Sequence, residues 1–135
     1  MYLLDSNICI YIINNNPKHV VTHIKKLQPH QIKLSAISIG ELEYGIAKSK
    51  YREKNRNALM HFASAFDILP FNDDDAEVFG IIRAELERKG EIIGPYDMQI
   101  AAQAISRDLI LVSNNVHEFK RIQNLKIENW VESLA

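Results

Sequence analysis

Polar side chains follow two short apolar runs of this sequence, at the point where each run ends. Asp5 comes directly after residues 2–4, and Ser113 and Asn115 come after residues 109–112. Continuous apolar runs of this length are typical of buried parallel strands, whose carboxyl ends share one edge of a sheet and border its ligand crevice. We therefore expect these side chains to lie close together in such a crevice, where chemistry on a bound substrate is feasible.

Two further acidic positions belong to helices predicted beside those strands. Asp97 lies near the start of a helix predicted over residues 96–106, on the same face as the apolar residues of its next turn. Glu41 lies in a helix predicted from residue 37 onward, although helical spacing alone does not distinguish it from Glu43. Both helices would bring an acid to the sheet edge described above.

Each of these residues also has a purely structural explanation. Asp5 is compatible with a turn in which Ser6 or Asn7 caps the following helix. Asp97 would also stabilise the positive end of its own helix dipole, and the polar residues after 109–112 are suited to capping the next helix. Only the shared position of all these residues favours a common site.

Several carboxylates in one crevice would repel one another and raise their pKa values unless a cation neutralised them. Oxygen ligands from Asp and Glu, without Cys or His beside them, favour Mg²⁺ or Mn²⁺ over Zn²⁺. A bound Mg²⁺ lowers the pKa of a coordinated water and stabilises the charge that develops on a phosphate. The pattern therefore indicates metal-assisted hydrolysis of a phosphodiester.

Length and composition narrow the class of protein. The 135 residues fit one domain, which we place at residues 1–135. A single cysteine, Cys9, excludes a disulfide within the chain, and it lies in an apolar segment that suits a buried thiol. No secretion signal or membrane span is indicated, so we expect a cytoplasmic protein without a membrane partner.

The formal net charge is -1, so no global attraction to nucleic acid is expected and such a partner would need a local basic patch. One cluster meets that description in a predicted connection between two helices, although a solvated surface also explains it. It consists of Lys48, Lys50, Arg52, Lys54 and Arg56. We call these five residues the basic cluster and consider them for contacts with RNA phosphates.

The remaining pattern alternates strands and helices, which predicts an α/β fold with a central, mostly parallel, twisted sheet of about four to five strands flanked by helices. Strands are predicted at 2–4, 31–35, 68–71 and 109–112, with a small edge strand in 126–130. Helices are predicted at 17–27, from 37, and at 52–66, 73–89, 96–106 and 118–122. The acidic triplet 73–75 is explained by the dipole of the helix it begins.

Four motifs, in order along nearly the whole chain, resemble the PIN-domain ribonucleases, specifically the VapC-type toxins of bacterial toxin-antitoxin pairs. They are Leu-Leu-Asp-Ser-Asn-Ile at the start, Ile-Ser-Ile-Gly-Glu-Leu-Glu-Tyr-Gly around Glu41, Ile-Gly-Pro-Tyr-Asp-Met-Gln-Ile-Ala-Ala around Asp97, and Leu-Val-Ser-Asn-Asn-Val-His-Glu-Phe around Asn115. The resemblance implies a PIN-like domain that acts as a magnesium-dependent endoribonuclease and halts translation, with transfer RNA as a family expectation.

The resemblance also implies roles for individual residues. Asp5 and Asp97 would be the principal ligands of Mg²⁺, with Mn²⁺ as a substitute, and Glu41 would be the third acid, in preference to Glu43. Asn115 would complete the catalytic set. Supporting positions would be Ser6, Asn7, Ser113, Asn114 and Glu118. The partners implied are a VapB-type antitoxin that masks the active site, a second copy of the toxin in a homodimer, and hetero-oligomers of the two proteins.

Two positions depart from the family pattern. Ser6 stands where the family commonly has threonine, and it keeps the hydroxyl. Many PIN domains have an acid near Asn115, whereas this chain has two asparagines there and its next acid is Glu118. The resemblance therefore leaves the number of metal ions open.

Three other functions compete with this interpretation. A phosphatase of the haloacid dehalogenase kind needs a second acid two residues after the first, where this chain has Asn7. A phospho-acceptor receiver domain needs an acidic pair at the first strand and a lysine after a late strand, where this chain has Ser113, Asn114 and Asn115. A catalytically silent PIN domain that only binds a partner stays open, because the fourth acid is missing.

Overall fold

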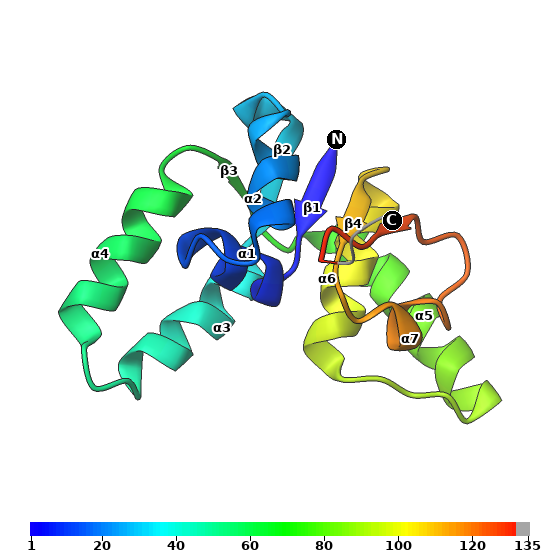
Figure 1. Cartoon of the computed structure of the whole chain (residues 1–135). Helices are drawn as coiled ribbons and strands as arrows, with labels where there is room; N and C mark the ends of the chain where they lie inside the picture. The colour runs from blue at the N-terminus through cyan, green and yellow to red at the C-terminus, as the bar shows by residue number, and fades with distance from the viewer. Residues whose placement is uncertain (132–135) are drawn as a thin grey trace.

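The computed structural model describes residues 1–131 of the chain, in which one sheet is covered by helices (Figure 1). The strands are β1 (Tyr2–Leu4), β2 (Ile32–Ser35), β3 (Asp67–Leu69), β4 (Ile110–Val112) and β5 (Ile127–Glu128). The α-helices are α1 (Ser6–Ile13), α2 (Lys18–Lys25), α3 (Ala36–Ala47), α4 (Arg52–Ala63), α5 (Asp73–Lys89), α6 (Pro95–Ser106) and α7 (Val116–Phe119), and a 3-10 turn spans Pro29–Gln31.

The five strands pair in the order β3-β2-β1-β4-β5, and every pairing is parallel. Leu4, the last residue of β1, lies opposite Leu34 of β2 and Val112 of β4. The chain builds the sheet outward from β1 in one direction and then returns to add β4 on the other side. A ligand crevice forms at such a reversal of strand order. The predicted α/β fold is confirmed, and the sheet is fully parallel within the described residues.

Two apolar clusters cover the two faces of the sheet, because successive residues of a strand point to opposite faces. Leu3 and Leu111 belong to the cluster that packs under α5 and α6. Leu4 and Val112 belong to the other cluster, with buried residues of α1 and α2. Figure 1 shows α3 and α4 extending beyond the sheet as a pair of helices. We call this pair the α3–α4 arm.

Several boundaries differ from the prediction. The apolar run after β1 forms the helix α1, and the carboxylate of Asp5 caps it, so the alternative in which Ser6 or Asn7 caps this helix is wrong. Strand β3 ends at Leu69 because Pro70 cannot donate a further ladder hydrogen bond, which leaves Phe71 outside it. These changes leave the order of elements intact.

Three helices also have other limits than predicted. Helix α4 ends at Ala63 instead of residue 66, because the chain turns before entering β3. Helix α2 covers Lys18–Lys25, with Pro17 as its N-cap, and is shorter than the predicted 17–27. Helix α7 begins at Val116 and ends at Phe119, earlier than predicted. Within residues 1–131 we find no helix with the length and apolar character needed to cross a membrane.

Candidate active site

Asp5 lies at the carboxyl end of β1 and is held there from three sides. Its backbone N–H donates to the carbonyl oxygen of Val112 at 3.1 Å, which ties it to β4. One carboxylate oxygen accepts from the backbone N–H of Ile8 at 3.0 Å, and the other accepts from the Ser113 hydroxyl at 2.5 Å. Only 7% of Asp5 is exposed. The carboxylate is therefore fixed at the point where β1, α1 and β4 meet.

Glu41 and Glu43 of α3 face different surroundings. A carboxylate oxygen of Glu41 accepts from the Ser6 hydroxyl at 2.8 Å, next to Asp5 in the chain. Glu43 instead pairs with Arg56 of α4 at 3.4 Å. The structure therefore places Glu41, and not Glu43, at the carboxyl edge of the sheet.

Asp97 stands in the first turn of α6, where Pro95 and Gly94 bring the chain into the helix. Burial raises the pKa of Asp97 to about 6, with further contributions from the negative charges of Glu41, Glu118 and Asp5. A carboxyl group senses such charges only over short distances. Glu41, Glu118 and Asp5 are therefore near enough for their charges to act on the carboxyl group of Asp97.

Asp5 shows the same electrostatic environment. Burial raises its pKa, and repulsion from Glu41 adds to the effect. Hydrogen bonds from Ser113 and from the backbone N–H groups of Ile8 and Asn7 partly offset both. Within residues 1–131, no lysine or arginine contributes to the pKa shift of Asp5 or Asp97. Negative charge is therefore concentrated around Asp5 and Asp97.

The residues after β4 divide between the site and the helix beside it. The side-chain amide of Asn115 donates to Glu118 at 3.0 Å, and its backbone N–H donates to the Ser113 hydroxyl at 2.9 Å. Asn114 donates instead to the hydroxyl of Tyr11 at 3.2 Å. Ser113, Asn115 and Glu118 thus reach the acidic site, whereas Asn114 fastens the loop to α1.

Two further polar residues, Asn7 and Ser38, lie close in the chain to Asp5 and Glu41. The side chain of Asn7 is exposed, and this residue contributes to the site through its backbone N–H. Ser38 lies one helical turn before Glu41 and is fully buried, yet its hydroxyl has no hydrogen-bond partner among the described residues. Sequence analysis did not single out Ser38, although it lies three residues before Glu41 on the same helix face.

The donor set fits a hard divalent cation by its chemistry. Asp5, Glu41 and Asp97 offer only carboxylate oxygens, and the repulsion among them would be relieved by a positive ion. As the side chains stand, no three Asp, Glu, His or Cys residues within residues 1–131 are close enough to hold an ion. Ser6 and Ser113 instead donate to Glu41 and Asp5. Metal binding would therefore require these serine contacts to rearrange or the acids to draw together.

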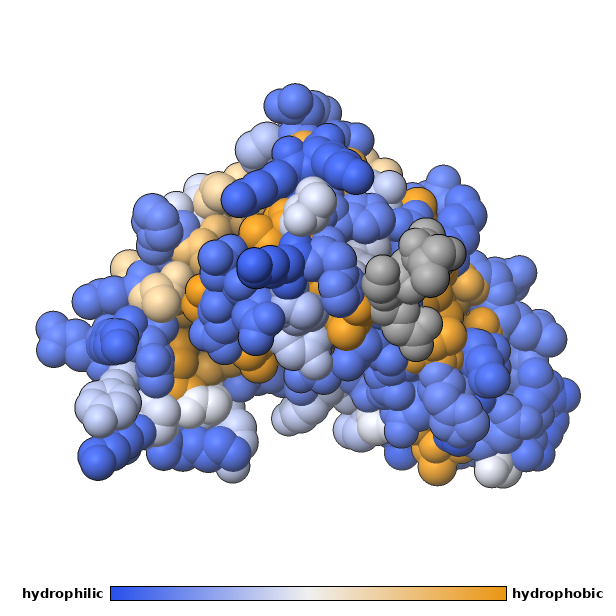
Figure 2. Space-filling model, in the orientation of Figure 1, coloured by the Kyte–Doolittle hydropathy of each residue, from blue (hydrophilic) through white to orange (hydrophobic). Residues whose placement is uncertain are grey.

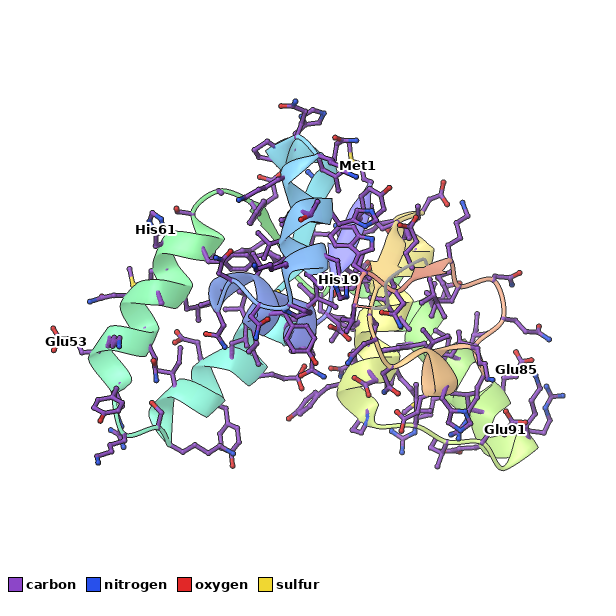
Figure 3. All side chains as sticks on the ribbon, in the orientation of Figure 1. Met1, His19, Glu53, His61, Glu85 and Glu91 are labelled. Atoms are coloured by element: carbon purple, nitrogen blue, oxygen red, sulfur yellow. The ribbon has the colours of Figure 1, made fainter. Side chains whose placement is uncertain are left out.

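The basic cluster lies on the α3–α4 arm. Lys48 lies over the ring of Tyr44 at 4.6 Å, and Arg56 pairs with Glu43. Lys54 lines a groove together with Glu41. Figure 3 shows Glu53 pointing away from the body of the molecule on α4, with Glu85 and Glu91 on the opposite side near α5. The arm thus carries the basic cluster together with Glu43 and Glu53.

Comparisons with known proteins agree with this geometry. The PIN domain family model matches residues 2–125. Ribonuclease VapC2 of Rickettsia felis is 44% identical over 131 residues, which cover 96% of this chain and 98% of the relative. The tRNA(fMet)-specific endonuclease VapC of Salmonella typhimurium is 41% identical over 129 residues, which cover 96% and 97%.

The fold is also similar to that of a solved complex. A chain in the crystal structure of VapBC2 from Rickettsia felis, bound to a DNA fragment from their promoter, matches with a TM-score of 0.90 and 43% identity. The match covers 96% of this chain and 98% of the other. Sequence and fold therefore agree over almost the full length of both chains.

Proposed function

This chain belongs to the PIN-domain family and is a nuclease of the VapC ribonuclease group, and from that premise we propose that it is a magnesium-dependent endoribonuclease, the toxin of a toxin-antitoxin pair. The observation that supports the chemistry is the group of acids at the ends of β1 and β4. Asp5 and Asp97 have raised pKa values because of burial and mutual repulsion, and no basic side chain within residues 1–131 offsets either shift. A divalent cation would relieve this repulsion.

In this proposal Asp5, Glu41 and Asp97 hold Mg²⁺, which when bound supplies an acidified water and charge for phosphodiester hydrolysis. Ser113 and the N–H of Ile8 orient the carboxylate of Asp5. Glu118 and Asn115 form a hydrogen-bonded pair beside them and add a fourth acid to the field around Asp97. The protein's own contribution is to hold the carboxylate of Asp5 in one orientation and to bring the other acids to the same edge of the sheet.

RNA is the proposed substrate, and the proposed place of the activity is the cytoplasm. The Salmonella relative is named for cleavage of tRNA(fMet), and a transfer RNA is accordingly the substrate class to test first. Phosphate contacts are proposed for the basic cluster, since Lys54 lines the groove that contains Glu41. The charge would draw the RNA backbone toward the acids.

A groove on the α3–α4 arm is the proposed site for an antitoxin. Two neighbouring hollows share Ile13 of α1 and Ala58 of α4, and we treat them together as one groove. Its walls are mainly apolar, it reaches Glu41 at one end, and Figure 2 shows apolar surface between this arm and the body. A VapB-type protein seated there would cover the acids, and the Rickettsia complex is the precedent for such a partner. A homodimer of the toxin completes the proposed assembly.

The deciding experiment measures cleavage of a defined transfer RNA by the purified chain. We expect cleavage with Mg²⁺, loss of cleavage with a chelator, recovery when Mg²⁺ is added in excess, and loss in Asp97→Asn. Mn²⁺ should replace Mg²⁺. Cleavage that continues in chelator and in Asp97→Asn would contradict the metal mechanism, and binding without cleavage would favour a silent PIN domain.

A further inference from the structure

A second polar network lies at the same carboxyl edge of the sheet, over β2 and β3. Its centre is Gln103 of α6, which is fully buried in the middle of an otherwise apolar helix face. The side-chain oxygen of Gln103 accepts from the hydroxyl of Ser35. Its amide donates to the carbonyl oxygens of Leu69 and Pro70 at 3.3 and 3.2 Å. One side chain therefore joins α6 to the ends of two strands.

Ser35 connects this network to the helix that carries Glu41. It is the last residue of β2 and the N-cap of α3, where its hydroxyl oxygen accepts from the N–H of Ile37 at 3.0 Å. Ser35 is also fully buried. The same hydroxyl thus caps the N-terminus of α3 and donates to Gln103 of α6. The position of each helix therefore depends on the other.

Each of the two hydrogen-bonded residues lies six positions from one of the two acids, Ser35 as the N-cap of α3 and Gln103 within α6. Glu41 follows Ser35 by six positions in α3, and Asp97 precedes Gln103 by six positions in α6. Six residues of α-helix span about 9 Å, and the two helices contact each other directly. A change of spacing at Ser35 and Gln103 would therefore be carried along two rigid helices to Glu41 and Asp97.

We propose that Gln103 is a positioning residue that sets the spacing of α3 and α6, and through it the separation of Glu41 and Asp97. This inference rests on the proposed function, because it assumes that these two acids act together on a divalent cation. A buried glutamine with three satisfied hydrogen bonds defines one packing arrangement, whereas apolar contacts alone tolerate sliding. A displacement of about 1 Å at a catalytic group is enough to lower a rate severely.

The test compares Gln103→Met with Arg107→Met. Methionine has a similar length without the hydrogen bonds, so Gln103→Met removes the connection and keeps the volume. Arg107 is the matched control, because it donates to Pro70 at 2.7 Å and to Asp75 at 3.0 Å in the same region but does not contact Ser35. Both variants should lower the unfolding temperature, and only Gln103→Met should alter the acidic site.

Three quantities are measured on each folded variant: kcat and KM for RNA cleavage at saturating Mg²⁺, and the Kd for Mn²⁺ without RNA, by electron paramagnetic resonance. For Gln103→Met we expect kcat to fall about tenfold with KM nearly unchanged, and the Kd for Mn²⁺ to rise about tenfold, as for other groups that orient metal ligands. Arg107→Met should match the wild type in all three.

The inference is overturned if Gln103→Met keeps the wild-type kcat and Mn²⁺ affinity, or if Arg107→Met loses as much of both. Should Gln103→Met fail to fold, Ser35→Ala decides in its place, because it removes the contact with α3 and keeps the bonds of Gln103 to β3. If Ser35→Ala keeps the wild-type Kd for Mn²⁺ and the wild-type kcat, the inference about Gln103 is overturned. Failure of the proposed function appears separately, as a wild-type protein that neither binds Mn²⁺ nor cleaves RNA.

Discussion

Two neighbouring glutamates of α3 show how contacts at the residue scale separate chemistry from surface charge. Glu41 accepts from Ser6 beside Asp5, and its charge raises the pKa values of Asp5 and Asp97. Glu43 pairs with Arg56, and the two side chains are 38% and 60% exposed. An exposed pair of this kind contributes at most about 1 kcal/mol to stability. The two glutamates should therefore respond differently to the same substitution.

We predict that Glu41→Gln lowers kcat for RNA cleavage by about 10- to 100-fold, the range seen when metal-site groups are changed. Glu43→Gln is the matched control and should leave kcat nearly unchanged, because its charge does not enter the field around Asp5 or Asp97. Both variants should remain folded, as judged by circular dichroism. Equal losses in the two variants would rule out a specific role for Glu41.

The raised pKa of Asp97 leads to a prediction about stability. Its pKa of about 6 in the folded protein exceeds the ordinary value of 3.8, so the folded state binds this proton more tightly than the unfolded state. The stability contributed by this group therefore falls as pH rises from 3.8 toward 6, and it stays low above that range. Without metal, Asp97→Asn should be more stable than the wild type at about pH 8, by about 1 kcal/mol after allowance for solvent screening.

Urea unfolding of the metal-free proteins at several pH values measures this difference, which should shrink as pH falls and vanish below about pH 3, where Asp97 is protonated in both states. Adding Mg²⁺ at about pH 8 should reverse the order, since a ligand that binds only the folded state stabilises it. A stabilising effect of Mg²⁺ that is equal in the wild type and in Asp97→Asn would argue that the ion binds elsewhere.

At the element scale, the junction of α5 and α6 depends on one carboxylate. Asp75 is fully buried, forms a capping box with Asn72, and accepts from Arg107 at 3.0 Å and from Ser106. Burial alone would raise the pKa of Asp75, but the bonds from Arg107, Asn72 and Ser106 outweigh it, so the pKa is lowered. The explanation of residues 73–75 by the helix dipole alone is therefore incomplete.

We predict that Asp75→Asn lowers the free energy of unfolding by about 2–3 kcal/mol, because it leaves Arg107 without its partner charge. Asp73→Asn is the control from the same triplet and should cost less than about 1 kcal/mol, since it removes only a helix-dipole interaction. Chemical denaturation at neutral pH measures both. Folded Asp75→Asn should keep its RNA cleavage, and equal losses of stability in the two variants would refute the special role of Asp75.

The lowered pKa of Asp75 also sets the pH range of its contribution. The stability that its ion pair adds is fully present above the ordinary pKa of 3.8 and is lost as pH falls through the lowered pKa of the folded state. Acid unfolding should therefore be less steep in Asp75→Asn than in the wild type.

At the scale of the whole molecule, charge is distributed unevenly around a chain that is nearly neutral. The formal net charge is only -1, yet basic residues gather on the α3–α4 arm and acids gather at the ends of β1 and β4. Local patches of this kind guide a polyanion to one part of a surface. The arrangement would bring the RNA backbone toward the acids despite their negative charge.

We predict that reversing Lys48, Lys50 and Lys54 to glutamate weakens RNA binding and reduces its dependence on salt. Each phosphate contact that is lost should lower the slope of log K against log salt by about 0.7. The control reverses Arg83, Arg88 and Lys89 of α5, which form local pairs with glutamates of their own helix. Affinity is measured in the Asp97→Asn background to prevent cleavage. Equal effects of the two triple variants would show a nonspecific effect of net charge.

Short-range patterns were sufficient to predict the order of the strands and of the helices from α2 to α7, whereas α1 was not predicted. Apolar runs at 2–4 and 109–112 predicted β1 and β4, and the polar residues after them predicted where a site would form. Capping and turn residues act within a few positions, so the predicted helix at 73–89 matches α5, which ends before Gly90 with its positive φ. Boundaries that depend on neighbouring elements, such as the end of α4, were not predictable in this way.

The tertiary structure decided which polar residues meet. Helical spacing left Glu41 and Glu43 equivalent, and the family resemblance favoured Glu41 without a physical reason. The packing of α3 against α1 and α4 supplies that reason, because Glu41 contacts Ser6 and Glu43 pairs with Arg56. Gln103 and Asp75 looked like ordinary helix positions, because their partners lie 31 to 68 residues away in the chain. A sequence determines local preference, whereas burial and long-range contacts, which set pKa values and align catalytic groups, exist only once the chain has folded.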